Sequence, residues 1–169
     1  MITPLNFNNF VSESFLDYPD NSSLSIVFYM PGCDRDCVGC HNSNLRDFAG
    51  FQYNDIIINS LYELCMSSKV NTLCLQGGDP LYKYNLEFTK ELLLKLGSKL
   101  NICIYTGATI DEVRKLNLQG FKFIKCGIFD KTKYIGSKKT DNYIQFATSN
   151  QELYNEDLNL VSKDGIFYF

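Results

Sequence analysis

LSIVFYMPGCDRDCVGCHN, residues 24–42, joins an apolar run to a loop with three cysteines. The run Leu24–Tyr29 is rich in β-branched and aromatic residues, which predicts a buried strand. The loop behind it spaces Cys33, Cys37 and Cys40 as C-x3-C-x2-C. An electron-carrying cubane iron–sulfur cluster receives four thiolates, so three would leave one iron open to another ligand. The stretch therefore predicts a strand that leads into a metal site.

A structural zinc site is an alternative for the same loop, with the only histidine, His41, as the fourth ligand. Cys40 and His41 are adjacent, however, and neighbouring side chains rarely reach one tetrahedral ion from a short loop. Zinc patterns also separate their ligand pairs by a dozen residues or more. The spacing favours a cluster, and a non-enzymatic cysteine-rich metal or electron-transfer module stays open.

Composition narrows the class of protein. The length of 169 residues predicts a single domain over residues 1–169, and 45% hydrophobic residues suffice for a core. The net charge of −3 gives no electrostatic reason to expect nucleic acid. The N-terminus is polar and aromatic, unlike a signal peptide, and no apolar run reaches transmembrane length. We therefore expect a cytoplasmic protein with reduced thiols and no membrane partner.

The other four cysteines and a small group of lysines need no functional role. The cysteines lie in apolar or helical patterns and are expected to be buried as small hydrophobic residues, except that Cys126 follows a strand and could face a site. They are Cys65, Cys74, Cys103 and Cys126. The lysines predict a solvated loop. They are Lys131, Lys133, Lys138 and Lys139.

Strand and helix patterns alternate after the cysteine loop. The expected strands are Thr72–Leu75, Leu100–Tyr105 and Phe121–Lys125, with extended segments at Asn142–Thr148 and Ile166–Phe169 and no assignment for residues 129–143. The expected helices are Asp55–Met66 behind the N-cap Asn54, Leu86–Leu96 capped by Asn85 and stopped by Gly97, and a short helix to Leu116 behind a Thr109/Glu112 capping box. This alternation predicts an α/β fold with a parallel sheet, either a compact partial (β/α) barrel or a curved open sheet.

Glycine-containing loops follow successive strands, at the edge where parallel α/β folds bind ligands. They are the cysteine loop, Gly77-Gly78-Asp79-Pro80, Tyr105-Thr106-Gly107 and Cys126-Gly127. Gly77 and Gly78 would let a ligand approach the backbone, and their carbonyls could accept hydrogen bonds from an ammonium group. Asp79 could add charge or could only hold the turn before Pro80. An amino acid-like ligand fits this edge.

The cysteine motif resembles that of the radical S-adenosylmethionine enzymes, and Cys40-His41-Asn42 resembles the glycyl-radical-enzyme activases among them. Three further motifs resemble the class III activases, which serve anaerobic ribonucleoside-triphosphate reductases. They are Gly77-Gly78-Asp79-Pro80-Leu81, Tyr105-Thr106-Gly107 and Ser149-Asn150-Gln151. The resemblance spans Ile26 to Gln151. It departs at Gly39, where the superfamily favours an aromatic residue, and after Lys125.

The resemblance implies a radical S-adenosylmethionine type of fold and an oxidoreductase. It implies a [4Fe–4S] cluster, at which S-adenosylmethionine is cleaved so that a 5′-deoxyadenosyl radical takes hydrogen from a glycine. The implied metal ligands are Cys33, Cys37 and Cys40, and the implied cofactor-binding residues are Gly39, Cys40, His41, Gly77, Gly78, Asp79, Thr106 and Gly107. No catalytic residue is assigned beyond these, and none at Lys125 or Cys126.

The implied partners are the large glycyl-radical subunit of the reductase and an external low-potential electron donor. The alternative within the superfamily is a radical enzyme that acts on a small molecule, such as a deazapurine precursor. Such an enzyme would need additional chain to enclose its substrate, whereas a protein substrate can itself cover an open site.

Overall fold

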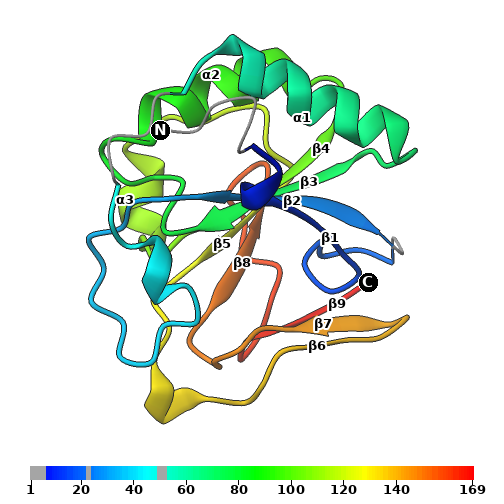
Figure 1. The fold of residues 1–169 in the computed structure, drawn as a ribbon. Helices are drawn as coiled ribbons and strands as arrows, with labels where there is room; N and C mark the ends of the chain where they lie inside the picture. The colour runs from blue at the N-terminus through cyan, green and yellow to red at the C-terminus, as the bar shows by residue number, and fades with distance from the viewer. Residues whose placement is uncertain (1–6, 22–23, 49–52) are drawn as a thin grey trace.

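The computed structural model describes residues 7–21, 24–48 and 53–169 (Figure 1). A six-stranded sheet has the order β1-β2-β3-β4-β5-β8, and a three-stranded sheet has the order β6-β7-β9. The large sheet contains β1 Val11–Ser14, β2 Ser25–Met30, β3 Thr72–Gly77, β4 Asn101–Tyr105, β5 Phe123–Cys126 and β8 Glu152–Asn155. The small sheet contains β6 Lys138–Lys139, β7 Tyr143–Gln145 and β9 Ile166–Tyr168. The helices are α1 Asp55–Ser67, α2 Leu86–Leu96 and α3 Ile110–Arg114, with 3₁₀ turns at Phe7–Phe10, Ser43–Leu45 and Lys131–Lys133.

The large sheet is mostly parallel and is not closed. Strands β2, β3, β4 and β5 pair in parallel, whereas β1 and β8 pair antiparallel at the two edges. Figure 1 shows α1 and α2 on one side of this sheet and the small sheet on the other. The predicted mixed α/β architecture with a parallel sheet is therefore confirmed, as an open sheet compatible with a partial barrel.

The alternation of side chains along β2 explains why both faces of the sheet are covered. Ile26 and Phe28 pack in the main core with α1 and α2, whereas Val27 packs on the opposite face with Cys74 and Cys103. Strands that bury both faces read as continuous apolar runs, and SIVFYM has this character. The sequence pattern thus reflects burial between two layers.

The cysteines outside the loop behave as expected, and one uncertainty is resolved. Cys65, Cys74 and Cys103 have no exposed surface. Cys126 is 2% exposed and belongs to the main core on the helix side of the sheet. It therefore does not face the loops at the strand ends.

Helix boundaries follow the sequence closely. Helix α2 begins and ends as predicted, and α1 extends one residue further than predicted. The Asn54 side chain accepts a hydrogen bond from the Ile57 amide, as an N-cap does. Thr109 and Glu112 form the expected capping box, although α3 ends at Arg114, two residues earlier than predicted.

Asn85 stands at the N-cap position of α2, but its side chain does not cap the helix. Its amide nitrogen donates to the carbonyls of Pro31 and Asp79, at 2.9 and 2.8 Å. Its amide oxygen accepts from the Tyr53 hydroxyl at 3.0 Å. The N-cap role expected of Asn85 is therefore wrong. The side chain instead ties α2 to the loops that follow β2 and β3.

The bounds of the strands differ from the predicted bounds more than those of the helices do. Strand β3 continues to Gly77 because Gly77 pairs with Met30 of β2. Strands β2, β4 and β5 shift by one or two residues from the predicted bounds, and β7 occupies only part of residues 142–148. Strands β1 and β8 were not expected. Both are short edge strands with polar residues, so their pairing depends on a neighbour and not on a hydrophobic run.

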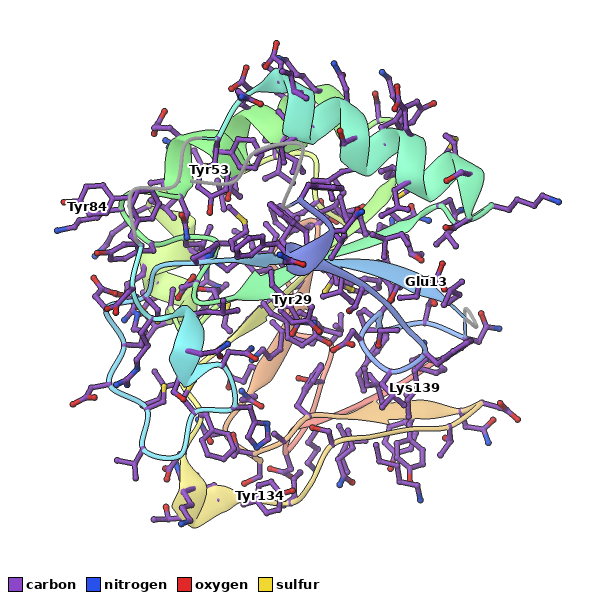
Figure 2. The ribbon with its side chains drawn as sticks, in the orientation of Figure 1. Glu13, Tyr29, Tyr53, Tyr84, Tyr134 and Lys139 are labelled. Carbon is purple, nitrogen blue, oxygen red and sulfur yellow. The ribbon has the colours of Figure 1, made fainter. Side chains whose placement is uncertain are left out.

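The lysine group is only partly a solvated loop. Lys139 lies on β6, is half-buried, and donates a hydrogen bond to the Tyr18 carbonyl at 2.8 Å (Figure 2). The solvated-loop interpretation is wrong for this residue. Within the part of the chain that the structure describes, no helix has the length and apolar character needed to span a membrane.

Candidate functional site

The carboxyl ends of β2, β3, β4 and β5 border a cavity of about 300 Å³. This volume lies at the lower end of the range for small-molecule sites. The cavity is lined by most of the residues predicted from the sequence, namely Cys33, Cys37, Cys40, His41, Gly77, Gly78, Thr106 and Gly107. Gly39 and Asp79 are not among the lining residues. The structure thus brings together the three loop thiols and the glycine-rich ends of two strands.

The cysteine loop is closed by its own backbone. The Gly32 amide donates to the Leu45 carbonyl at 2.7 Å, and the Cys33 amide donates to the Arg46 carbonyl at 3.0 Å. Gly32 has a φ of +102°, a conformation that glycine adopts readily and that turns the chain out of β2. These contacts hold the two ends of the loop together, so the three thiols are presented from one compact segment.

Side chains then fix this loop to its neighbours. The Arg35 guanidinium donates to Glu112 Oε1 of α3 at 2.9 Å, and Arg46 donates to the Arg35 carbonyl at 2.9 Å. Asn42 Nδ2 donates to the Gly77 carbonyl at 3.2 Å. The loop is therefore attached both to α3 and to the end of β3.

The donor set fits an iron–sulfur cluster better than a single ion. Among the described residues, no three His, Cys, Asp or Glu side chains are placed to hold one metal ion. In a cubane each thiolate binds a different iron, so the thiols need not converge on one point. The Arg35 amide also donates to Cys33 Sγ at 3.4 Å, which favours a thiolate, although burial raises the pKa of the Cys33 thiol. Three thiols at one cavity suit a group with several metal atoms.

The glycines at the end of β3 are required by backbone packing. A Cβ on Gly78 would lie 2.4 Å from the Gly32 carbonyl oxygen, and a Cβ on Gly77 would lie 2.6 Å from the Met30 nitrogen. Both distances are shorter than real Cβ contacts. The Gly78 amide donates to the Met30 carbonyl at 2.8 Å. The two glycines therefore let the ends of β2 and β3 touch, and they also line the cavity.

Asp79 occupies a different position from the one its charge suggested. Its side chain is only 2% exposed, and its carboxylate accepts from the Thr106 hydroxyl, the Gly107 amide and the Leu81 amide at 2.8 to 3.0 Å. Burial raises the pKa of Asp79, while these hydrogen bonds act in the opposite direction. Asp79 therefore joins the loop after β3 to the loop after β4.

An aromatic group borders the cavity beside the cysteine loop. A Cβ on Gly39 would lie 3.7 Å from a ring carbon of Phe129, which lines the cavity. The Phe129 ring is 5.5 Å from the His41 ring and 6.2 Å from that of Tyr134, which Figure 2 shows near the turn Lys131–Lys133. Phe129 therefore supplies an aromatic ring close to Gly39 of the cysteine loop.

Lys125 lines the cavity, and sequence reasoning assigned it no role. It lies on β5, its side chain is 8% exposed, and its ammonium is 5.0 Å from the centre of the Tyr105 ring. Burial lowers its pKa from 10.5 to about 8. Its spacing from Phe123, two residues earlier in the same strand, could have indicated that both side chains lie on the face opposite the helices.

The comparisons with known proteins agree with the chemistry of these residues. The family described as "4Fe-4S single cluster domain" matches residues 23–154. An anaerobic ribonucleoside-triphosphate reductase-activating protein of Enterobacteria phage T4 is 27% identical over 108 residues, which are 60% of this chain and 68% of that protein. A protein of the same name from Haemophilus influenzae is 25% identical over 155 residues, 86% of this chain and 97% of that protein. No solved structure gave a significant match.

Proposed function

This chain belongs to the 4Fe-4S single cluster domain family, and on that premise we propose that it activates an anaerobic ribonucleoside-triphosphate reductase. The observation that carries the proposal is that three loop thiols and the glycine-lined end of β3 share one cavity. The names of the two relatives support the same function.

In the proposed site, Cys33, Cys37 and Cys40 hold three irons of a [4Fe–4S] cluster. Gly77 and Gly78 line the methionyl group of S-adenosylmethionine, with Thr106 and Gly107 further along the same edge. When bound, the cluster would supply the electron that cleaves the sulfonium and yields a 5′-deoxyadenosyl radical, which takes hydrogen from a glycine of the reductase. The electron would come from an external low-potential donor.

The protein itself contributes orientation and shielding. The Arg35–Glu112 pair and the Asn42 contact hold the thiol loop against α3 and β3, so the cavity has a fixed shape. His41 and Phe129 form an aromatic border that would flank the bound cofactor and limit access of water.

Exposed apolar side chains near the cavity favour a protein substrate over a small molecule. Val38 of the cysteine loop is 75% exposed, and Ile128, which lines the cavity, is 46% exposed. Tyr134, in ring contact with Phe129, is 57% exposed. Clustered exposed apolar residues are typical of surfaces that a partner covers. A loop of the reductase that carries the target glycine would cover them.

The function is tested by following the hydrogen atom. The reduced, reconstituted protein is mixed anaerobically with S-adenosylmethionine and an anaerobic reductase whose glycines carry deuterium at Cα. We expect deuterium in 5′-deoxyadenosine and a glycyl radical signal on the reductase by electron paramagnetic resonance. Cleavage of S-adenosylmethionine without label transfer and without a protein radical would reject the activase function.

The ligand assignment is tested separately. We expect Cys33→Ala, Cys37→Ala and Cys40→Ala each to abolish cluster binding, because the described part of the loop offers no replacement thiol. Cys65→Ala and Cys74→Ala are the controls, since both side chains are fully buried away from the cavity. Iron and sulfide are measured after anaerobic reconstitution. A full complement of iron in Cys37→Ala would reject the assignment.

A further inference from the structure

A short basic segment borders the strand-end cavity. Residues 129–139 contain four lysines and one aspartate, which sum to a charge of +3 in a chain whose net charge is −3. Phe129 and Lys138, near the two ends of the segment, both line the cavity. A molecule that approaches the cavity on this side therefore meets a local positive charge, although the chain as a whole is acidic.

Three of the four lysines reach solvent. Lys131, Lys133 and Lys138 are exposed, and we call these three residues the basic edge. Lys139 is instead turned inward to a backbone carbonyl. Within the part of the chain that the structure describes, Lys131 and Lys138 form no ion pair, and Lys133 lies 3.8 Å from Asp130. The charge of the basic edge is thus only partly neutralised by carboxylates of the protein.

The acidic side chains of the cysteine loop do not balance this charge. Asp34 lies 3.9 Å from Arg35, and Asp36 lies 3.0 Å from Arg46, so each carboxylate already has a cation beside it. Among the described residues that line the cavity, Asp17 is the one acidic side chain, and it is half-buried. The border of the cavity is therefore positive at the basic edge and close to neutral at the cysteine loop.

Hydrogen bonds hold the backbone of the basic edge in place. The Asp130 side chain accepts from the Thr132 amide at 3.0 Å and caps the turn Lys131–Lys133. The Ser149 amide donates to the Lys133 carbonyl at 3.0 Å, and β6 is paired with β7. Lysines on a fixed backbone present their charge at a defined place beside the cavity, which suits recognition of one particular partner.

Apolar side chains stand between the lysines. Ile128, Tyr134 and Ile135 are all exposed, and Figure 2 shows Tyr134 at the turn. Exposed apolar groups surrounded by polar ones are typical of surfaces that a partner covers. A partner that covers these groups must also supply carboxylates, because burial of an unpaired ammonium group is costly. The chemistry of this border thus matches a protein segment that is both acidic and partly apolar.

We propose that the basic edge docks an acidic, partly apolar segment of the reductase and so directs the target glycine to the cavity. This inference rests on the proposed function, because it concerns the same protein substrate. Opposite charges on two proteins speed their encounter and fix their relative orientation, and salt screens this contribution. The basic edge therefore acts on the association of the two proteins and not on the chemical steps at the cluster.

The test compares proteins that differ in where two charges are reversed. Lys131→Glu/Lys133→Glu changes the basic edge, and neither residue is among the described residues that line the cavity. Lys69→Glu/Lys99→Glu is the control, because it gives the same net charge. Lys69 and Lys99 are exposed and precede β3 and β4, at the sheet edge opposite the cavity. Both variants should hold the cluster as wild type does.

Each protein is reconstituted anaerobically, reduced with dithionite, saturated with S-adenosylmethionine and titrated with the reductase. The initial rate of glycyl radical formation is followed by electron paramagnetic resonance. At an ionic strength of about 0.01 M, we expect the rate at low reductase concentration to fall on the order of ten- to a hundredfold in Lys131→Glu/Lys133→Glu and at most about twofold in the control. The difference should shrink at about 1 M, where charges are screened within about 3 Å. The rate at saturating reductase should change little.

Iron content and the cleavage of S-adenosylmethionine without reductase are measured for every protein. A salt-sensitive loss confined to Lys131→Glu/Lys133→Glu, with both of these values equal to those of wild type, supports the inference. Equal rates in the two double variants, or a faster rate in Lys131→Glu/Lys133→Glu, overturn it and leave the proposed function intact. If that variant does not fold, Lys131→Gln/Lys133→Gln is compared with Lys69→Gln/Lys99→Gln in the same way.

Two further measurements separate other occupants of the basic edge. A loss that appears only when a protein electron donor replaces dithionite would assign the edge to the donor and overturn the inference. A wild-type dimer in sedimentation that Lys131→Glu/Lys133→Glu does not form would assign the edge to a second copy of this chain, with the same consequence. A wild type that cleaves S-adenosylmethionine but places no radical on the reductase would reject the proposed function itself, and the inference with it.

Discussion

The ends of β3 and β5 each bury a charged side chain, but the two charges differ in their hydrogen-bond partners. After β3, the carboxylate of Asp79 accepts hydrogen bonds from Leu81, Thr106 and Gly107. On β5, the ammonium of Lys125 is almost as deeply buried and has the Tyr105 ring beside it. The first charge is satisfied by hydrogen bonds within the fold, whereas the second has no hydrogen bond among the described residues. Burial of a charge therefore indicates a ligand site only where the protein does not complete its hydrogen bonds.

The largest effect is expected from Gly78→Val at the end of β3. Its Cβ would lie 2.4 Å from the Gly32 carbonyl oxygen, and Gly32 precedes Cys33 directly. Because backbone must move, we expect the free energy of unfolding to fall by about 4 kcal/mol or more. Cluster binding should fall as well, because the cysteine loop is displaced.

The matched variant at the end of β5 is Gly127→Ala. Gly127 has a φ of +102°, and its Cβ would lie 3.1 Å from the Asn150 carbonyl oxygen, so a loss of only about 1 to 2 kcal/mol is expected. Urea unfolding of the two variants and their iron contents give the comparison. An equal loss of stability in both would show that the end of β3 is no more tightly packed than the end of β5.

Asp79→Ala should have the next largest effect. The change leaves the buried Thr106 hydroxyl and the partly buried amides of Leu81 and Gly107 without their acceptor, and we expect the protein to lose about 3 kcal/mol of stability. Chemical denaturation of the metal-free protein measures it. Asp130, which is partly exposed and accepts hydrogen bonds from Thr132 in a surface turn, is the control, and Asp130→Ala should cost clearly less stability. Similar losses for the two variants would contradict the structural role of Asp79.

Lys125→Met should raise the stability, by a smaller amount than Gly78→Val and Asp79→Ala lower it. Below pH 8 the folded protein carries a buried charge whose desolvation outweighs its electrostatic partners, so its removal should raise the stability of the ligand-free protein by about 2 kcal/mol. Asp79, Cys37, Cys103 and Cys126 are the titratable groups near enough to influence Lys125.

The pH dependence of that gain follows from the lowered pKa. The unfolded chain keeps the lysine protonated to about pH 10.4, whereas the folded chain releases the proton near pH 8. The buried charge therefore lowers the free energy of unfolding of wild type by its full amount below pH 8. This loss becomes smaller as the pH rises toward 10. The advantage of Lys125→Met should shrink over the same range, as measured by urea unfolding from pH 7 to 10. A variant that is less stable than wild type at pH 7 would show that the ammonium is already satisfied by the protein.

Sequence reasoning succeeded where local rules decide the structure. The bounds of α2 and the Thr109/Glu112 capping box follow from periodicity and from contacts within one turn. The shared cavity of the cysteine loop and the strand-end glycines follows from the rule that parallel strands place their ends at one edge. Each of these depends on neighbours in sequence or on sheet topology alone.

Prediction from the sequence failed where the position of a side chain or strand depends on backbone that is distant along the chain. Asn85 has the right residue type for a cap, but carbonyls of Pro31 and Asp79 compete for its amide. Gly77 and Gly78 line the cavity as expected, but their tight backbone contacts with Met30 and Gly32 could not be foreseen from the sequence. Strand β8 forms because β5 offers an edge, which no pattern within its own residues records.

The closure of the cysteine loop has a consequence for the order in which the site can assemble. The hydrogen bond from Gly32 to Leu45 spans 13 residues along the chain, whereas the bond from Asp79 to the Gly32 carbonyl spans 47. Closing the shorter loop costs about 1 kcal/mol less chain entropy. While the protein is synthesised, the thiol loop is complete before β3 leaves the ribosome. We therefore expect a nascent chain to display its three thiols together before the cavity that encloses them exists, which defines an early interval in which iron and sulfide have unhindered access.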